Sequence, residues 1–145
     1  MSTCLLNELA NAQDSYSPIG KGFLTGQIKS IDDFGEGDFR RIVPAFQGEN
    51  FNTNMKLVHA VQDLASKKGC TSAQLALGWL RALSKRPGMP EIIPIPGATT
   101  VERVKENAVV VEMSEKDMQA IDNVLSEFKV AGGRYPEHMQ HLLNT

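Results

Sequence analysis

IIPIPGATTVERVKEN, residues 92–107, decides the fold, because in it an apolar run meets a Pro-Gly break and then the start of a helix. The apolar run holds three β-branched residues between turn residues, which predicts a short buried strand rather than a helix. These residues are Ile92, Ile93 and Ile95. Either Thr99 or Thr100 can cap a helix that begins at Val101.

A strand that runs through a glycine into a helix favours an anion site. Gly97 lets the backbone approach a ligand closely. The free N–H groups and the positive dipole end of the helix point at the same gap. Arg103, one turn into the helix, adds a planar set of donors that suits a phosphate, and Glu106 and Asn107 lie near its face. The alternative is a plain strand-to-helix corner with a solvated arginine.

Two segments together resemble the aldo-keto reductase family. IPIPGATTVERVKEN, residues 93–107, resembles the last barrel strand and the following helix of that family, and YSPIGKGFLTG, residues 16–26, resembles the preceding strand and loop. They lie in the family's order and at about its spacing, and the resemblance extends from residue 16 to the C-terminal end. GGRYPEH, residues 132–138, is most similar to a fungal pyridoxal-reductase-like branch.

The resemblance implies an α/β fold, the C-terminal part of a TIM (β/α)8 barrel. Such barrels typically run to about 250 residues, with eight strands each followed by a helix. We therefore expect an incomplete barrel in this chain, mostly helical, with about two short parallel strands. Residues 1–15 are predicted to form a segment outside the family, with a short helix in it, and residues 16–145 to form the C-terminal, NADP-binding portion.

Residues 16–26 combine three glycines with a proline, which by themselves predict only a turn. In the family this stretch touches the pyrophosphate of the cofactor through its backbone and its first polar side chain. The resemblance thus implies cofactor contacts for five residues. They are Ser17, Pro18, Ile19, Gly20 and Gly22.

The resemblance places the other cofactor contacts in the second segment, and it implies NADP(H) as the cofactor. Gly97, Thr99 and Arg103 are expected around the adenosine 2'-phosphate. Glu106 and Asn107 are expected at the adenine.

No catalytic residue carries over from the family. Aldo-keto reductases use an Asp, Tyr, Lys and His set that lies upstream of the part this chain resembles, and neither Tyr16 nor Tyr135 occupies the catalytic position. The expected function is NADP(H)-dependent reduction of an aldehyde or ketone, pyridoxal among the candidates. The alternative is a non-catalytic remnant or a nucleotide-binding module.

The composition limits the classes of partner that the chain is expected to bind. The chain has 145 residues, 41% of them apolar, with a formal net charge of −2 and no basic block, which argues against nucleic acid and anionic membranes. No run is long and apolar enough for a membrane span, and no signal-peptide pattern is seen, so a cytoplasmic protein is expected. A small-molecule carbonyl substrate is what the family resemblance implies. Cys4 and Cys70 are predicted to be free thiols. His138 and His141 lack a third ligand, so no metal site is predicted.

Helix signals fill the rest of the chain. Asn54 is predicted to cap a helix that ends at Gly69, and Thr71 and Ser114 to open the next two through capping boxes. Trp79 is expected in the core. Residues 27–52 are predicted to form a long loop, in which three phenylalanines either line a pocket or pin the loop to the core, and two arginines are candidates for a cofactor contact. These residues are Phe39, Phe46, Phe51, Arg40 and Arg41.

Overall fold

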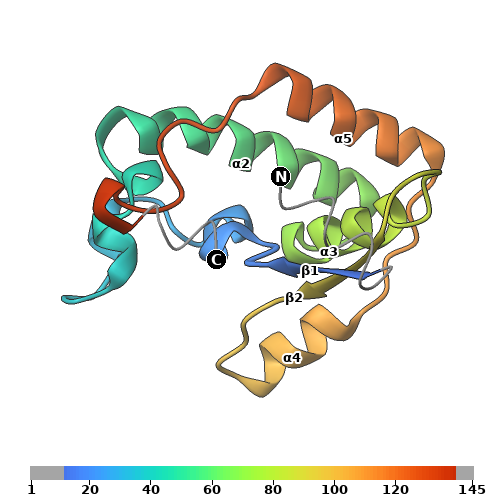
Figure 1. The fold of residues 1–145 in the computed structure, drawn as a ribbon, viewed down its shortest axis with the longest axis horizontal. Coiled ribbons are helices and arrows are strands. Elements are labelled where there is room, and N and C mark those ends of the chain that lie inside the picture. The colour runs from blue at the N-terminus through green and yellow to red at the C-terminus, as the bar shows by residue number, and fades with distance from the viewer. Residues whose placement is uncertain (1–11, 140–145) are drawn as a thin grey trace.

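A computed structural model describes residues 12–139 as an α/β arrangement of two strands and four α-helices (Figure 1). The strands are β1 (Ala12–Tyr16) and β2 (Glu91–Ile95), and the α-helices are α2 (Gly48–Lys68), α3 (Ser72–Leu83), α4 (Val101–Ala108) and α5 (Glu115–Glu127). Between β1 and α2 the chain forms the 3-10 helices η1 (Gly20–Thr25), η2 (Ile31–Asp33), η3 (Phe39–Ile42) and η4 (Pro44–Phe46). The short helix predicted near the N-terminus falls outside the described residues.

The two strands pair in parallel, as predicted. Ala12 pairs with Glu91 and Tyr16 with Ile95, so both strands end at the same edge of the sheet. The helices α2 and α3 make the crossover between them, the usual route between parallel strands. The loops that follow β1 and β2 consequently emerge side by side.

The strand at residues 92–95 is confirmed, but the prediction that it is buried is wrong. Ile93 is 44% exposed and Ile95 is 47% exposed, while the alternate positions are half-buried. Successive side chains of a strand point to opposite faces. Helix α3 packs against β2, and the face that carries Ile93 and Ile95 is open in the described part of the chain.

The helices form layers on the sheet. In Figure 1, α2 and α5 lie along one side of the molecule, α3 lies between them and the strands, and α4 lies beyond β2. The packing of α2 with both α3 and α5, and of α3 with both β2 and α4, agrees with this view. No helix in the described part is long and apolar enough to cross a membrane.

Residues 27–52 were expected as a loose loop, but residues 48–52 belong to α2 and residues 27–47 contribute an ordered part of the core. Phe23 packs edge-on against Phe46 and Phe51, with ring centroids 5.1 and 5.4 Å apart, and Phe34 does the same with Phe46 at 5.4 Å. Edge-to-face pairs at these distances stabilise the fold beyond what burial of the rings alone contributes. Phe46 and Phe51 are therefore core residues, and Phe39 packs against Tyr135. Of the two alternatives, the one in which these phenylalanines pin the loop to the core is confirmed for Phe46 and Phe51, and none of the three lines the cavity.

Most predicted helix ends are confirmed. Thr71 and Ser114 both form capping boxes, and Gly69 ends α2 in the left-handed conformation, with φ of 74°. Trp79 packs on the cluster formed by Ala65, Leu75 and Ile121, as expected of a core residue.

Asn54 does not cap α2, which begins six residues earlier, at Gly48. Asn54 is only 4% exposed, and both the oxygen and the nitrogen of its side-chain amide are hydrogen-bonded. It donates to the carbonyl oxygens of Ala45 and Ala131, both at 2.9 Å, and accepts from the Ala131 N–H at 2.8 Å. A residue type that usually opens helices thus ties the C-terminal segment to the middle of one.

Candidate functional site

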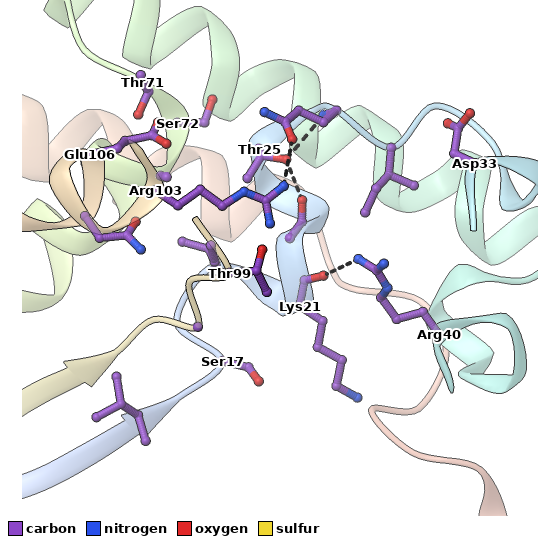
Figure 2. A pocket seen from close by; sticks show the side chains of 18 of the residues that line it. Ser17, Lys21, Thr25, Asp33, Arg40, Thr71, Ser72, Thr99, Arg103 and Glu106 are labelled. Carbon is purple, nitrogen blue, oxygen red and sulfur yellow. Dashed lines mark hydrogen bonds between the residues drawn. The ribbon is translucent and has the colours of Figure 1, made fainter. Parts of the chain in front are cut away.

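A cavity of about 800 Å³ opens at the carboxyl ends of the two strands. Its walls come from the turn after β1, from η1 and the following loop, from the start of α3, and from the β2–α4 corner (Figure 2). The lining residues are Tyr16, Ser17, Ile19, Lys21, Gly22, Thr25, Gln27, Ile28, Asp33, Phe34, Arg40, Thr71, Ser72, Ala73, Ile95, Gly97, Thr99, Arg103, Glu106 and Asn107. In parallel α/β proteins, ligands bind at this end of the strands.

The β2–α4 corner has the features expected of an anion site. Thr100 caps α4, its side chain accepting a hydrogen bond from the Arg103 N–H at 3.3 Å. A Cβ built at Gly97 would meet no atom within 4 Å, so the backbone there is bare toward the cavity. The first N–H groups of a helix lack intrahelical partners and carry positive partial charge. An anionic group bound beside Thr99 and Arg103, which line the cavity, would lie near that end of the helix.

Arg103 projects from the first turn of α4 into the middle of the cavity (Figure 2). Its single side-chain hydrogen bond in the described structure runs from Nη2 to the Gln27 Oε1, at the long distance of 3.5 Å. No carboxylate of the described residues pairs with it, so most of its five donors are left for a ligand. A guanidinium held loosely in a cavity suits bidentate recognition of phosphate.

The opposite wall is a tight turn after β1. The Gly20 N–H donates to the Ser17 carbonyl at 2.9 Å, and the Gly22 N–H donates to that of Ile19 at 3.1 Å. Ser17 and Lys21 both adopt left-handed conformations, with φ of 52° and 57°. Backbone of this kind is unfavourable for residues with a side chain and is found where the surrounding structure enforces it, often at ligand sites.

Arg40 fixes this turn from η3. Its Nη1 donates to the Lys21 carbonyl oxygen at 3.2 Å, and its Nε and Nη2 bind the Asp38 carboxylate. These hydrogen bonds lower the pKa of Asp38 from its usual value. Arg40 lines the cavity, whereas the Arg41 guanidinium donates to the carbonyl oxygens of Ile31 and Phe34. Arg41 does not line the cavity, and a cofactor contact of Arg40 stays a prediction.

The C-terminal segment also reaches the turn. Arg134 Nη2 donates to the Tyr16 carbonyl oxygen at 2.6 Å, and Lys21 Nζ donates to the Arg134 carbonyl oxygen at 2.9 Å. The Lys21 ammonium lies 4.2 Å from the centre of the Tyr135 ring. Burial lowers the pKa of Lys21, because removal of water disfavours its charged form.

The structure brings most of the predicted site residues to one cavity. Ser17, Ile19 and Gly22 line it from the β1 side. The predicted residues of the other segment line it from the β2 side; they are Gly97, Thr99, Arg103, Glu106 and Asn107. Pro18 and Gly20 belong to the same turn but do not line the cavity. Contact of each residue with a nucleotide stays a prediction.

Some residues that line the cavity were not among the predicted site residues. Lys21 and Thr25 lie inside the 16–26 segment, so the motif itself could have pointed to them. Thr71 and Ser72 were expected only as a helix start. They reach the cavity because α3 packs against η1 and α4, a tertiary contact that no local pattern predicts.

The fold and cavity define an α/β protein with a cavity at the carboxyl ends of two parallel strands. Residues 8–126 match the family model described as Aldo/keto reductase family. The chain therefore belongs to the aldo/keto reductase family. The match includes residues 8–15, which the motifs had left outside the resemblance, and the division of the chain at residue 16 stays a prediction.

Curated relatives agree with this assignment. The chain is 42% identical over 123 residues to aldo-keto reductase yakc of Schizosaccharomyces pombe, whose name includes NADP(+), with 83% of this chain and 35% of that protein covered. It is 35% identical over 122 residues to aldo-keto reductase str7 of Strobilurus tenacellus, at the same coverage of 83% and 35%.

A third relative bears on the finer resemblance. The chain is 37% identical over 129 residues to a Saccharomyces cerevisiae protein named "Putative pyridoxal reductase", with 83% of this chain and 37% of that protein covered. The predicted resemblance to aldo-keto reductases of the pyridoxal-reductase type is thus confirmed. The chain spans between 35% and 37% of the length of these relatives.

Proposed function

We propose that this chain forms the NADP(H)-binding part of an oxidoreductase that reduces an aldehyde or ketone to the alcohol by hydride transfer. One observation carries the proposal. Arg103 and the capped start of α4 face the turn after β1 across a single cavity, at the end of the strands where such proteins bind ligands. The NADP(+) in the name of the Schizosaccharomyces pombe relative supports the choice of cofactor.

The donor set fits a dinucleotide that carries an extra phosphate. Three cationic side chains line the cavity, Lys21, Arg40 and Arg103, against two carboxylates, Asp33 and Glu106. Lys21 and Arg40 bind groups of the protein, so Arg103 is the cation whose donors are left for the extra phosphate. The volume of about 800 Å³ lies in the usual range for cofactor sites.

Each wall has a role in this proposal. Arg103, Gly97 and Thr99 would hold the 2'-phosphate, Glu106 and Asn107 would lie at the adenine, and the turn after β1 would hold the pyrophosphate. When bound, NADPH supplies the hydride, and the residues of this chain bind and orient it. We assign no catalytic residue, and the carbonyl substrate, with pyridoxal as a candidate from the yeast relative's name, belongs to the proposal.

A second proposal is a nucleotide-binding module without reductase activity. The cavity does contain a tyrosine and a lysine, Tyr16 and Lys21. The Lys21 ammonium, however, is bound to the Arg134 carbonyl oxygen and covered by Tyr135, away from any described carboxylate. Binding of NADPH without turnover of any aldehyde would favour this second function. A cytoplasmic location and the absence of nucleic-acid partners stay predictions.

The test of the first proposal is a comparison of NADPH and NADH affinities in Arg103→Gln. We expect NADPH to bind roughly 10- to 100-fold more weakly, because a hydrogen-bonded charge pair contributes about 1.5–3 kcal/mol, and NADH binding to change little. Lys105→Gln is the matched control, because Lys105 is exposed on the same helix and does not line the cavity. Affinity is measured by fluorescence titration.

Thermal unfolding of the same proteins gives an independent measurement. A ligand at one hundred times its dissociation constant stabilises the folded state by about 2.7 kcal/mol, which raises the unfolding temperature visibly. If NADPH leaves the unfolding of the unmodified chain unchanged, or if both nucleotides weaken equally in Arg103→Gln, the assignment of the 2'-phosphate to this corner is wrong.

A further inference from the structure

The turn after β1 carries two unfavourable backbone conformations within five residues. Ser17 and Lys21 are the only residues other than glycine with positive φ among those described. A residue with a Cβ enters this region at an energetic cost, and the conformation persists only where neighbouring contacts enforce it. The contacts that enforce it here come from segments far away in the sequence.

Two arginines hold the peptide groups beside these two residues. Arg134 donates to the Tyr16 carbonyl oxygen, which belongs to the peptide bond that precedes Ser17. Arg40 donates to the carbonyl oxygen of Lys21 itself. One arginine therefore fixes the entry of the turn and the other fixes its exit. A charged donor makes a stronger hydrogen bond to a carbonyl than a neutral one does.

The segment that contributes Arg134 is anchored on both sides. Residues 131–135 are named here the C-terminal strap. At its start, the buried Asn54 side chain binds both the N–H and the carbonyl of Ala131. Gly132 has φ of 80°, and a Cβ there would lie 2.8 Å from the Ala45 nitrogen, so the strap lies directly on η4.

The far end of the strap closes on the turn through aromatic contacts. The Tyr135 ring lies under the Lys21 ammonium at 4.2 Å and beside the Phe39 ring, with centroids 6.0 Å apart. The Arg134 guanidinium carbon lies 5.5 Å from the centre of the Tyr16 ring. Cations over aromatic faces are attracted to them. Neither Arg134 nor Tyr135 lines the cavity.

We propose that Arg134 is a positioning residue for the dinucleotide, and that the C-terminal strap holds residues 16–22 in the conformation that receives the cofactor's phosphates. The proposal rests on the proposed function, because it takes this turn as a wall of the nucleotide site. Without Arg134, the turn relaxes toward ordinary backbone conformations and the binding-competent fraction falls. The apparent dissociation constant then rises in inverse proportion to that fraction.

The test uses Arg134→Met in the full chain. Methionine keeps most of the side-chain length and loses the donors. We expect faster amide hydrogen exchange in residues 16–22, with exchange in α2 and α5 and the unfolding temperature unchanged, and about fivefold weaker NADPH binding. Arg134→Lys keeps one donor within reach and should restore much of both effects. Lys129→Met removes an exposed positive charge just before the strap and should change neither.

Each outcome of these measurements supports or overturns the proposed role of Arg134. Unchanged exchange in residues 16–22, or faster exchange throughout the chain, would overturn the role of the strap. Faster exchange in the turn with NADPH affinity unchanged would show that the turn is held by Arg134 but does not position the nucleotide. If the unmodified chain binds no NADPH, the proposed function fails and positioning with it, while local exchange still reports whether Arg134 holds the turn.

Discussion

At the scale of single residues, Asp117 shows how one carboxylate joins two helices. Its Oδ2 accepts from the Ser114 N–H at 2.9 Å and from Lys68 Nζ at 2.5 Å, which links the start of α5 to the end of α2. These hydrogen bonds lower the pKa of Asp117 to about 2. A carboxyl group whose pKa is lower in the folded state than in the unfolded state stabilises the fold at neutral pH.

Because folding lowers the pKa of Asp117, we predict a pH-dependent change in stability for Asp117→Asn. The contribution of Asp117 is complete above the unfolded pKa of about 3.9 and is lost as the pH falls toward the folded pKa of about 2. The variant should be about 1 kcal/mol less stable at pH 7, since the pair is partly exposed and screened. It should lose less stability than the unmodified protein between pH 4 and pH 2. Urea unfolding at a series of pH values measures both.

Asp63→Asn is the control for this series, because Asp63 is exposed on α2. It should reproduce the stability of the unmodified protein at pH 7. Parallel acid profiles for Asp117→Asn and the unmodified protein would contradict the assignment.

At the scale of elements, α3 meets the segment before α5 at a point of backbone contact. Gly78 lies in the middle of α3, and a Cβ there would be 2.8 Å from the Val111 carbonyl oxygen and 3.3 Å from the Met113 sulfur. The backbone cannot yield as a flexible side chain can. The absence of a side chain at this position therefore sets how closely the two segments pack.

We predict that Gly78→Ala lowers the free energy of unfolding by about 1–2 kcal/mol. Alanine favours a helix over glycine by nearly 1 kcal/mol, so a gain in stability would be expected if the contact were loose, but overpacking costs about 1–3 kcal/mol. Gly35→Ala is the matched control, because a Cβ at Gly35 meets nothing within 4 Å. Urea unfolding measures both variants, and a stabilised Gly78→Ala would show that the contact yields.

Contacts between residues close in the sequence explain which features the sequence could predict. Helix ends at Gly69, Thr71 and Ser114 follow local rules, because a cap binds backbone within three residues of itself. The strand at 92–95 and the corner after it also depend on neighbouring residues, so a local pattern predicts them. Asn54 was misread because its partner Ala131 is 77 residues away, and no nearby residue reveals that contact.

The residues of the candidate site also fall into those that a local pattern predicts and those that it does not. The residues of the two motifs reach the cavity because each follows a strand directly, and parallel pairing brings the strand ends together. Thr71 and Arg134 came from elsewhere: one depends on how α3 packs, and the other donates across 118 residues to Tyr16. Their roles follow from tertiary structure, which a reading of neighbouring residues does not contain.

At the scale of the whole molecule, two apolar faces lie open in the described structure. One is the sheet face with Ile93, where the neighbouring Tyr16 and Ile95 also line the cavity, and the other is on α4, where Val101 is 63% exposed and Val104 is 56% exposed. No residue of α4 is buried. Exposed apolar side chains gathered on neighbouring elements mark a candidate surface for association.

We predict that this chain associates with itself as its concentration rises, and that Val104→Lys weakens the association. The exposed position should leave the free energy of unfolding within about 0.5 kcal/mol of the unmodified value, because little packing is lost there. Val130→Lys makes the same substitution at a valine that is 64% exposed and lies on neither apolar face, so it should leave association unchanged. Sedimentation velocity over a concentration series measures association. An equal decrease in both variants would point to net charge as the cause, whereas no decrease in Val104→Lys would remove α4 from the associating surface.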